Sequence, residues 1–323
     1  GHTGNVLALS TGVLISIAGP GGLSTVIRRV PKRSLNLSRV NAVNELSRLA
    51  AEGRVSPADT LRELRRIQTS EALSALSMAL LAGGSAGSFA LMFGGGFYEF
   101  AAAFVCGMGA QTVGYLFRRA DISLVLVSLV GGLLCSFLTM GAYHLFPLTP
   151  AGVETTLSGA IMPLISGLMM TNAMRDTLRG DLISGLARSV EALLVAVMVA
   201  LGISLVLRFY LPGEQSIAVS QPPWYLSVLL AGSATLCFCP LIKAPNRAVV
   251  PASLLGMAAY GAFLLLRGLP GADDTLALFA ASAAVALLCE LLARRMRMIS
   301  TVFLCAALIP LVPGLGLYRT MHE

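Results

Sequence analysis

The stretch AIMPLISGL, residues 160–168, returns later in the chain as ALIPLVPGL, residues 307–315, with five of nine positions identical. Each copy sets a proline and a glycine inside an apolar segment long enough to cross a bilayer. Proline removes a backbone donor and glycine loosens a helix, so we expect both spans to be bent or broken at mid-depth. Paired interruptions of this kind point to the substrate site of a transporter.

The composition places most of the chain in lipid. Of 323 residues, 56% are hydrophobic and 12% are charged, and the mean hydropathy is +0.79, whereas a soluble domain carries about 25% charged residues. The net charge of +7 does not indicate a nucleic-acid partner, because the basic residues are spread over loops. The six cysteines fall in apolar segments without metal-site spacing, so we expect buried free thiols and no metal or other cofactor.

Residues 1–70 differ from the rest and have the pattern of a small α+β domain. Val6–Ala18 and Thr25–Val30 have the character of strands. Ser38–Ala51 carries apolar residues at helical spacing, and Ser56-Pro57 predicts the start of a second helix. The chain begins with glycine, so we expect it to be a piece of a longer protein and this domain to be a partial one.

Nine apolar spans follow, each near the roughly 20 residues that a bilayer requires. They divide into a first membrane repeat over residues 71–210, with five spans, and a second over 211–323, with four. The expected spans are 72–92, 97–117, 122–143, 153–172, 189–208, 224–242, 248–266, 275–293 and 299–318.

The distribution of Lys and Arg predicts the orientation of these spans. With residues 1–70 in the cytoplasm, ten basic residues lie at inner ends of spans and three at outer ends. The inner residues are Arg118, Arg119, Arg175, Arg179, Arg188, Lys243, Arg247, Arg294, Arg295 and Arg297, and the outer ones are Arg208, Arg267 and Arg319. This excess predicts a multi-pass protein of the plasma (inner) membrane with a cytoplasmic N-terminus.

The number of spans in each repeat predicts that the two repeats are inverted relative to each other. A unit of five spans is odd in number, so its second copy must cross the membrane in the opposite direction. Weaker echoes agree, since ALMF at 90–93 resembles TLCF at 235–238, and LLC at 133–135 resembles LLC at 287–289. We therefore expect an all-α polytopic membrane protein with two inverted five-helix repeats, the last helix being absent here. Inverted repeats are a common basis for alternating access.

The interrupted spans supply the first candidates for a substrate site. An opened backbone near mid-membrane offers carbonyl and amide groups to a zwitterionic or anionic solute, although a packing kink is the plain alternative. Asn172 follows the first interruption, and Tyr318 and Arg319 follow the second, as an interface anchor or an outer gate. The candidate substrate-binding residues are Pro163, Gly167, Asn172, Pro310, Pro313, Gly314 and Tyr318.

Three acids are candidates for proton coupling. Asp176 lies at the expected cytoplasmic mouth, and Glu191 opens an otherwise apolar run. Glu191 also has the i, i+3 spacing of an ion pair with Arg188, and Glu290 has the i, i+4 spacing with Arg294. Acids inside spans are rare and usually face a cavity, so coupling and simple pairing both stay open, with Arg188, Arg294 and Arg319 as gate or charge partners.

Motifs of catalysis are missing from the sequence. It has no GxSxG elbow, no P-loop and no HExxH, and none of its three histidines lies in a predicted span. We therefore expect a transporter without enzymatic activity of its own.

Two long motifs resemble those of the threonine/serine exporter family. The first runs from Pro163 through Asn172 and Asp176 to Arg188 and Glu191, and the second includes ELLAR at 290–294, PLVPG at 310–314 and the Tyr-Arg pair at 318–319. The resemblance implies a cytoplasmic, hydrolase-like N-terminal domain joined to ten spans in two related halves. It also implies export of threonine and serine driven by the proton motive force, with a two-subunit branch that exports dicarboxylates such as succinate.

The sequence thus predicts a secondary exporter of threonine and serine, coupled to protons and working by alternating access. A dicarboxylate exporter is the alternative within transport, and a membrane-anchored hydrolase or sensor acting through the N-terminal domain is the alternative of another class. The expected partners are the small solute, protons and the lipid bilayer, and a homo-oligomer is compatible with the sequence.

Overall fold

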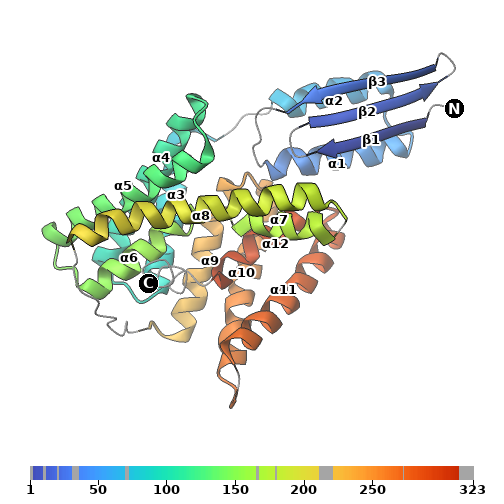
Figure 1. Ribbon diagram of the computed structural model, residues 1–323. Coiled ribbons are helices and arrows are strands. Elements are labelled where there is room, and N and C mark those ends of the chain that lie inside the picture. The colour runs from blue at the N-terminus through green and yellow to red at the C-terminus, as the bar shows by residue number, and fades with distance from the viewer. Residues whose placement is uncertain are drawn as a thin grey trace. The chain divides into compact units, whose positions relative to one another are not determined.

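The computed structural model describes the chain except for residues 1–2, 10–11, 20–21, 31–35, 70–72, 165–166, 179, 211–220, 272 and 313–323. The described residues form two compact units, one of residues 1–35 and 166–194 and the other of residues 36–165 and 195–323. Figure 1 shows the elements.

The N-terminal strands form one antiparallel sheet. β1 (Thr3–Leu9), β2 (Gly12–Gly19) and β3 (Gly22–Arg29) follow in sequence order, with β2 in the middle. The register pairs Val6 with Ile15 and Ile15 with Val26. The two strand-like segments of the sequence are thus confirmed, the first of them as a hairpin.

Helices make up the rest of the described chain. Two lie before the spans, α1 (Leu37–Ala51) and α2 (Pro57–Thr69), and both match their expected places. The following helices are α3 (Ala75–Met92), α4 (Phe97–Arg119), α5 (Leu124–Leu145), α6 (Pro150–Ile161), α7 (Gly167–Leu178), α8 (Leu182–Tyr210), α9 (Trp224–Leu241), α10 (Asn246–Arg267), α11 (Asp274–Met296) and α12 (Ser300–Ala307), with the 3₁₀ turn η1 (Ile309–Leu311).

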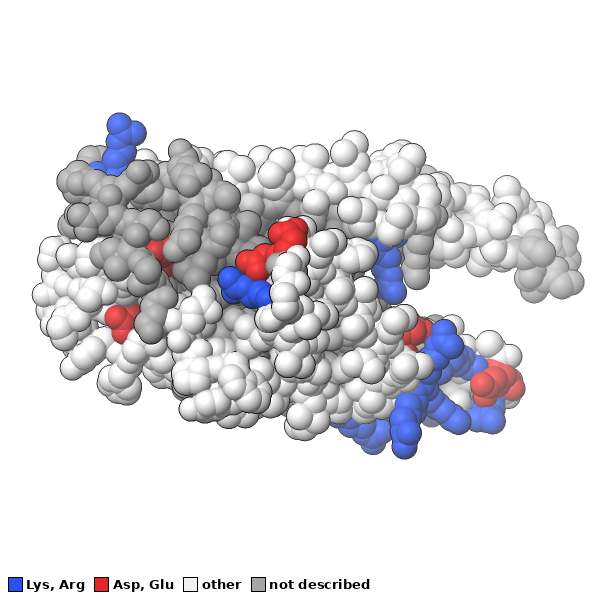
Figure 2. All heavy atoms as spheres, turned by 90° about the horizontal axis from the view of Figure 1, so that it is seen from below, with Lys and Arg blue, Asp and Glu red and all other residues white. Residues whose placement is uncertain are grey.

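Seven of these helices are long and apolar enough to cross a membrane, namely α3, α4, α5, α8, α9, α10 and α11. They correspond to seven of the nine expected spans. The other two expected spans are the interrupted ones, and within the described residues neither forms a single long helix. Figure 2 shows that most of the visible surface carries no charged side chain, which suits a lipid-embedded protein.

The core of the larger unit surrounds α6. Val153, Leu157, Ala160 and Ile161 of α6 pack with buried residues of α4, α5 and α8. Glycines bring these helices close together, because a Cβ on Gly132 of α5 would meet the carbonyl oxygen of Val199 on α8 at 2.7 Å. Small residues at such contacts are the usual means of close helix packing in membranes.

Two helical hairpins of this unit have the same construction. The turn after α3 and the turn after α9 contain the same three backbone hydrogen bonds at a shift of 149 residues, and Gly94 and Lys243 both have positive φ there. The contacts between helices recur at that shift too. Gly83 faces Met108 as Gly232 faces Met257, and Gly107 faces Ala86 as Gly256 faces Thr235.

Helices α3 and α9 pack against each other in opposite directions. The hydroxyl of Ser233 donates to that of Ser88 at 3.0 Å, and Gly84 faces the sulfur of Cys237. Moving four residues toward the N-terminus of α3, from Ser88 to Gly84, thus corresponds to moving four residues toward the C-terminus of α9, from Ser233 to Cys237.

Helix α1 is bonded to two loops of the same unit. The Ser38 amide donates to the Lys243 carbonyl at 2.8 Å, and the Arg48 guanidinium donates to the Arg297 carbonyl at 3.1 Å. The buried side chain of Asn41 accepts from the Ile299 amide at 3.2 Å. These bonds tie α1 to the loops α9–α10 and α11–α12.

Candidate functional site

The first proline stretch ends a short helix. Thr149 caps α6, accepting from the Gly152 amide at 3.0 Å, and Pro150 occupies the first helical turn, where its missing N–H costs nothing. The helix stops at Ile161, and the amide of Leu164 donates to the Ile161 carbonyl at 2.9 Å in a tighter turn. Pro163 lies in this turn, so the expected interruption of the fourth span is present.

The second proline stretch ends a helix in the same way. α12 stops at Ala307, and Pro310 lies in η1, where the Leu311 amide donates to the Leu308 carbonyl at 3.1 Å. This bond corresponds to the bond from Leu164 to Ile161 at a shift of 147 residues, the shift of the sequence repeat. The predicted residues Pro313, Gly314, Tyr318 and Arg319 lie outside the described residues.

Most of the described residues of both turns are buried within the protein. Ile161, Met162, Pro310 and Leu311 are buried, while Pro163 is half-buried and Leu164 packs against the core around α6. Backbone groups that a turn frees inside a membrane are tolerated where protein or a water-filled cavity encloses them, and the burial of these residues is compatible with such a place.

The other unit holds Gly167, Asn172, Asp176, Arg188 and Glu191. Its hairpin of α7 and the first part of α8 turns at Gly180, whose φ is +90°. Across the hairpin the Arg188 guanidinium lies 2.7 Å from the Asp176 carboxylate, and both side chains are partly buried. Asn172 and Glu191 are half-buried. The structure thus brings Asp176 to Arg188, a partner that the sequence spacing did not predict.

Glu290 and Arg294 form the i, i+4 pair that the sequence offered as one alternative. Their charged atoms lie 3.0 Å apart, and both side chains are largely exposed, at 46% and 76%. An exposed pair of this kind contributes little to stability. The contact gives Glu290 a plain structural role beside its proposed role in coupling.

Helix α6 carries a polar segment that was not among the predicted site residues. Glu154, Thr155, Thr156 and Ser158 are all buried, and Ser85 of the neighbouring α3 is buried as well. The signal was visible, because Glu154 is an acid inside the predicted fourth span, and such acids usually serve function.

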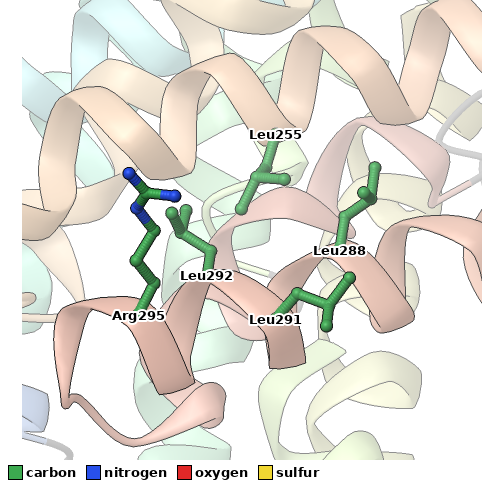
Figure 3. A pocket seen from close by; sticks show the side chains of 5 residues that line it. All are labelled: Leu255, Leu288, Leu291, Leu292 and Arg295. Carbon is green, nitrogen blue, oxygen red and sulfur yellow. The ribbon is translucent and has the colours of Figure 1, made fainter.

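A pocket of about 290 Å³ lies between α10 and α11 (Figure 3). Four leucines and one arginine line it: Leu255, Leu288, Leu291, Leu292 and Arg295. The leucine side chains offer no hydrogen bond to a polar solute, and neither proline turn contributes to the wall. We therefore do not assign the solute to this pocket.

Comparison with known proteins finds two family models along the chain. A model described as "Putative threonine/serine exporter" matches residues 1–210, and one described as "Threonine/Serine exporter" matches residues 227–323. No solved structure matches the chain.

Two curated relatives are similar over most of the chain. The "Threonine/serine exporter" of Corynebacterium glutamicum is 27% identical over 311 residues, which are 92% of this chain and 62% of the relative. The "Probable threonine/serine exporter" of Mycobacterium tuberculosis is 26% identical over 314 residues, 92% of this chain and 58% of the relative. The chain thus spans about three fifths of the length of these relatives.

Proposed function

The chain belongs to the threonine/serine exporter family, and from this membership we propose that it exports threonine, serine and similar small amino acids across a membrane. The family is one of transporters rather than enzymes. The observation that carries the proposal is the pair of matched helix ends at Pro163 and Pro310, which interrupt two apolar segments at corresponding places.

Alternating access between two inverted halves is the mechanism we propose. In its support, the hairpins α3–α4 and α9–α10 share turns and contacts at one shift of 149 residues, while α3 and α9 run in opposite directions. Two halves of equal construction and opposite direction can exchange conformations, which converts an inward-open state into an outward-open one.

We place this protein in the plasma membrane with its N-terminus in the cytoplasm. The hydrogen bonds of α1 support this, because they tie it to loops at Lys243 and Arg297, where basic residues gather. Such loops face the cytoplasm under the positive-inside rule.

The domain boundaries at residues 70 and 210 stay predictions.

Protons are the proposed coupling ion, with Asp176, Glu191 and Glu290 as carriers. The carboxylates of Asp176 and Glu290 lie within ion-pair distance of Arg188 and Arg294. Glu191 is half-buried in an otherwise apolar part of α8.

A dicarboxylate exporter is the weaker alternative. It needs a cation for the second carboxylate of the solute, and Arg188, one of the predicted charge partners, is paired with Asp176. Both relatives carry threonine and serine in their names.

Counterflow in proteoliposomes tests the proposal. Vesicles loaded with unlabelled threonine should accumulate labelled threonine, and an imposed pH gradient should change the rate. Labelled succinate tested under the same conditions distinguishes a threonine/serine exporter from a dicarboxylate exporter. Exchange of succinate but not of threonine would overturn the proposal, whereas threonine exchange that ignores the pH gradient would remove only the coupling.

A further inference from the structure

One face of α11 carries a row of leucines that ends in an arginine. The row consists of Leu288, Leu291, Leu292 and Arg295, whose spacing of i, i+3, i+4 and i+7 places them on one side of the helix. From Leu288 to Arg295 the row covers about two turns, or roughly 10 Å along the helix axis. This face of α11 is therefore apolar along most of its length and positively charged at its C-terminal end.

The pocket between α10 and α11 lies along this face. Leu255 of α10 contributes the opposite wall, and the volume is about 290 Å³. Figure 3 shows the Arg295 side chain rising from α11 toward α10 beside Leu292, at one end of the row of leucines. The pocket thus suits a ligand that joins an apolar chain to an anionic group.

The leucines of this pocket belong to the lipid-facing surface. Leu291 is 62% exposed and Leu288 46%. Among the seven candidate spans of the described chain, α10 and α11 have the smallest share of their apolar stretch buried, 28% each. Acyl chains are as apolar as leucine, so lipid covers such side chains in a membrane.

Arg295 differs from its neighbour Arg294 in its charge partners. The Arg294 guanidinium donates to the Glu290 carboxylate at 3.0 Å. None of the ion pairs among the described residues includes Arg295. A guanidinium binds a phosphate group with two parallel hydrogen bonds, so an anionic headgroup would supply the partner that these residues do not.

The charged end of the pocket lies where basic residues gather. Arg294, Arg295 and Arg297 follow one another at the end of α11, and Arg48 of α1 donates to the Arg297 carbonyl at 3.1 Å. The positive-inside rule places this end at the cytoplasmic surface. Basic pockets between membrane helices on that side bind anionic headgroups. Arg295 at the surface and leucines at greater depth follow the order of headgroup and acyl chain in a phospholipid.

We propose that the pocket between α10 and α11 is a binding site for an anionic phospholipid. The phosphate group binds Arg295, and one acyl chain lies along Leu255, Leu288 and Leu291. A second copy of the chain could also cover an apolar surface. A two-fold axis along the membrane normal would bring both Arg295 side chains to the same depth, where like charges repel, so the charge of the pocket favours the lipid.

Quenching of tryptophan fluorescence by brominated lipids tests this assignment. The chain has one tryptophan, Trp224, so Trp224→Phe combined with Leu291→Trp places the only fluorophore at the pocket. This variant is reconstituted into mixtures of phosphatidylglycerol and phosphatidylcholine in which one lipid or the other is brominated. We expect the anionic lipid to bind about fivefold more strongly than the zwitterionic one, as one arginine contact implies. High salt should weaken this preference.

Three controls separate the pocket from the general charge of the surface. Arg295→Gln should remove the preference, while Arg295→Lys keeps the charge and should keep most of it. Arg294→Gln removes the same charge from the next residue and should retain the preference, because Arg294 is 76% exposed and pairs with Glu290. Trp224 in the unsubstituted protein begins α9, whose other end leads to the cytoplasmic loop at Lys243, so its quenching should show no preference.

Several results would overturn the proposal. Equal binding of the two lipids would do so, and so would an equal loss of preference in Arg295→Gln and Arg294→Gln. Quenching by neither lipid would also overturn it, because protein rather than lipid would then cover the pocket. Circular dichroism confirms that each variant is folded. The experiment measures no transport, so its outcome is independent of the proposed export function.

Discussion

The hydroxyl of Ser233 on α9 donates a hydrogen bond of 3.0 Å to the hydroxyl of Ser88 on α3. A second contact, between Gly84 and Cys237, lies one turn away. The shift of 149 residues converts Ser88 into Cys237 and Gly84 into Ser233, so each contact is the counterpart of the other. Two equal elements related by a two-fold axis produce reciprocal contacts of this kind. The hairpins α3–α4 and α9–α10 therefore meet at α3 and α9.

Close packing of α6 on α3 gives the first prediction, for Gly159→Ala. The added Cβ would lie 2.6 Å from backbone atoms of Ala86 and Ala90, which cannot move as a side-chain end can. We expect a loss of about 1–3 kcal/mol in the free energy of unfolding. Gly141→Ala is the matched control, because its Cβ meets nothing within 4 Å, and it should be neutral or stabilising by up to about 1 kcal/mol. Thermal unfolding in detergent measures both, and equal melting temperatures would contradict the packing.

The sequence predicted the helices well because the signal for each is local. An apolar run of about 20 residues predicts a span, and Ser56-Pro57 predicted the start of α2 at Pro57. The two interruptions were predictable for the same reason, since proline acts on its own turn. The register between the hairpins α3–α4 and α9–α10 was not predicted correctly. The echo of 90–93 in 235–238 implied a shift of 145 residues, about one helical turn from the shift of 149 in the hairpins. Apolar helices look alike after a shift by one turn, so their sequence does not fix the register.

Other features could not be predicted because they depend on contacts between residues that are not neighbours in the sequence. The pairing of Asp176 with Arg188 depends on the turn at Gly180, whereas the pairing of Glu290 with Arg294 follows from helical spacing alone. The burial of Thr156 and Ser158 likewise depends on the helices that pack around α6.

The bond between Asn41 and Ile299 gives the second prediction. Asn41→Ala leaves the Ile299 amide without its partner at the start of α12, beneath a buried part of α1. We expect a loss of about 1–3 kcal/mol in the free energy of unfolding. Ser47→Ala on the exposed face of α1 is the control and should change stability by less than about 0.5 kcal/mol. Chemical denaturation followed by circular dichroism measures both, and a null effect of Asn41→Ala would show that α1 does not hold the α11–α12 loop.

Proton coupling gives the third prediction. Glu191→Gln keeps the size of the side chain and removes its charge, so we expect threonine exchange to continue while its dependence on the pH gradient is lost. Glu290→Gln should keep that dependence, because Glu290 is exposed and pairs with Arg294 near the end of α11. Uptake with and without an imposed gradient measures both variants. An unchanged gradient effect in Glu191→Gln would remove this residue from the coupling path, and a loss in Glu290→Gln instead would move the path to α11.

The proline turns give the last prediction, for Pro163→Ala and Pro310→Ala. Each substitution restores a backbone N–H and lets the preceding helix continue through the turn, which withdraws backbone groups that the solute is proposed to bind. We expect each variant to bind threonine about tenfold more weakly, the loss that one hydrogen bond implies, while the fold persists because neighbouring buried residues such as Ile161 and Leu311 are unchanged. The two turns contain equivalent hydrogen bonds, so the two losses should be similar.

Equilibrium binding of labelled threonine to the detergent-solubilised protein measures the affinity, and Pro251→Ala within α10 is the control for removing a proline from a helix. Normal affinity in both variants would mean that the turns are packing kinks, and a loss in Pro163→Ala alone would place the solute at the first turn.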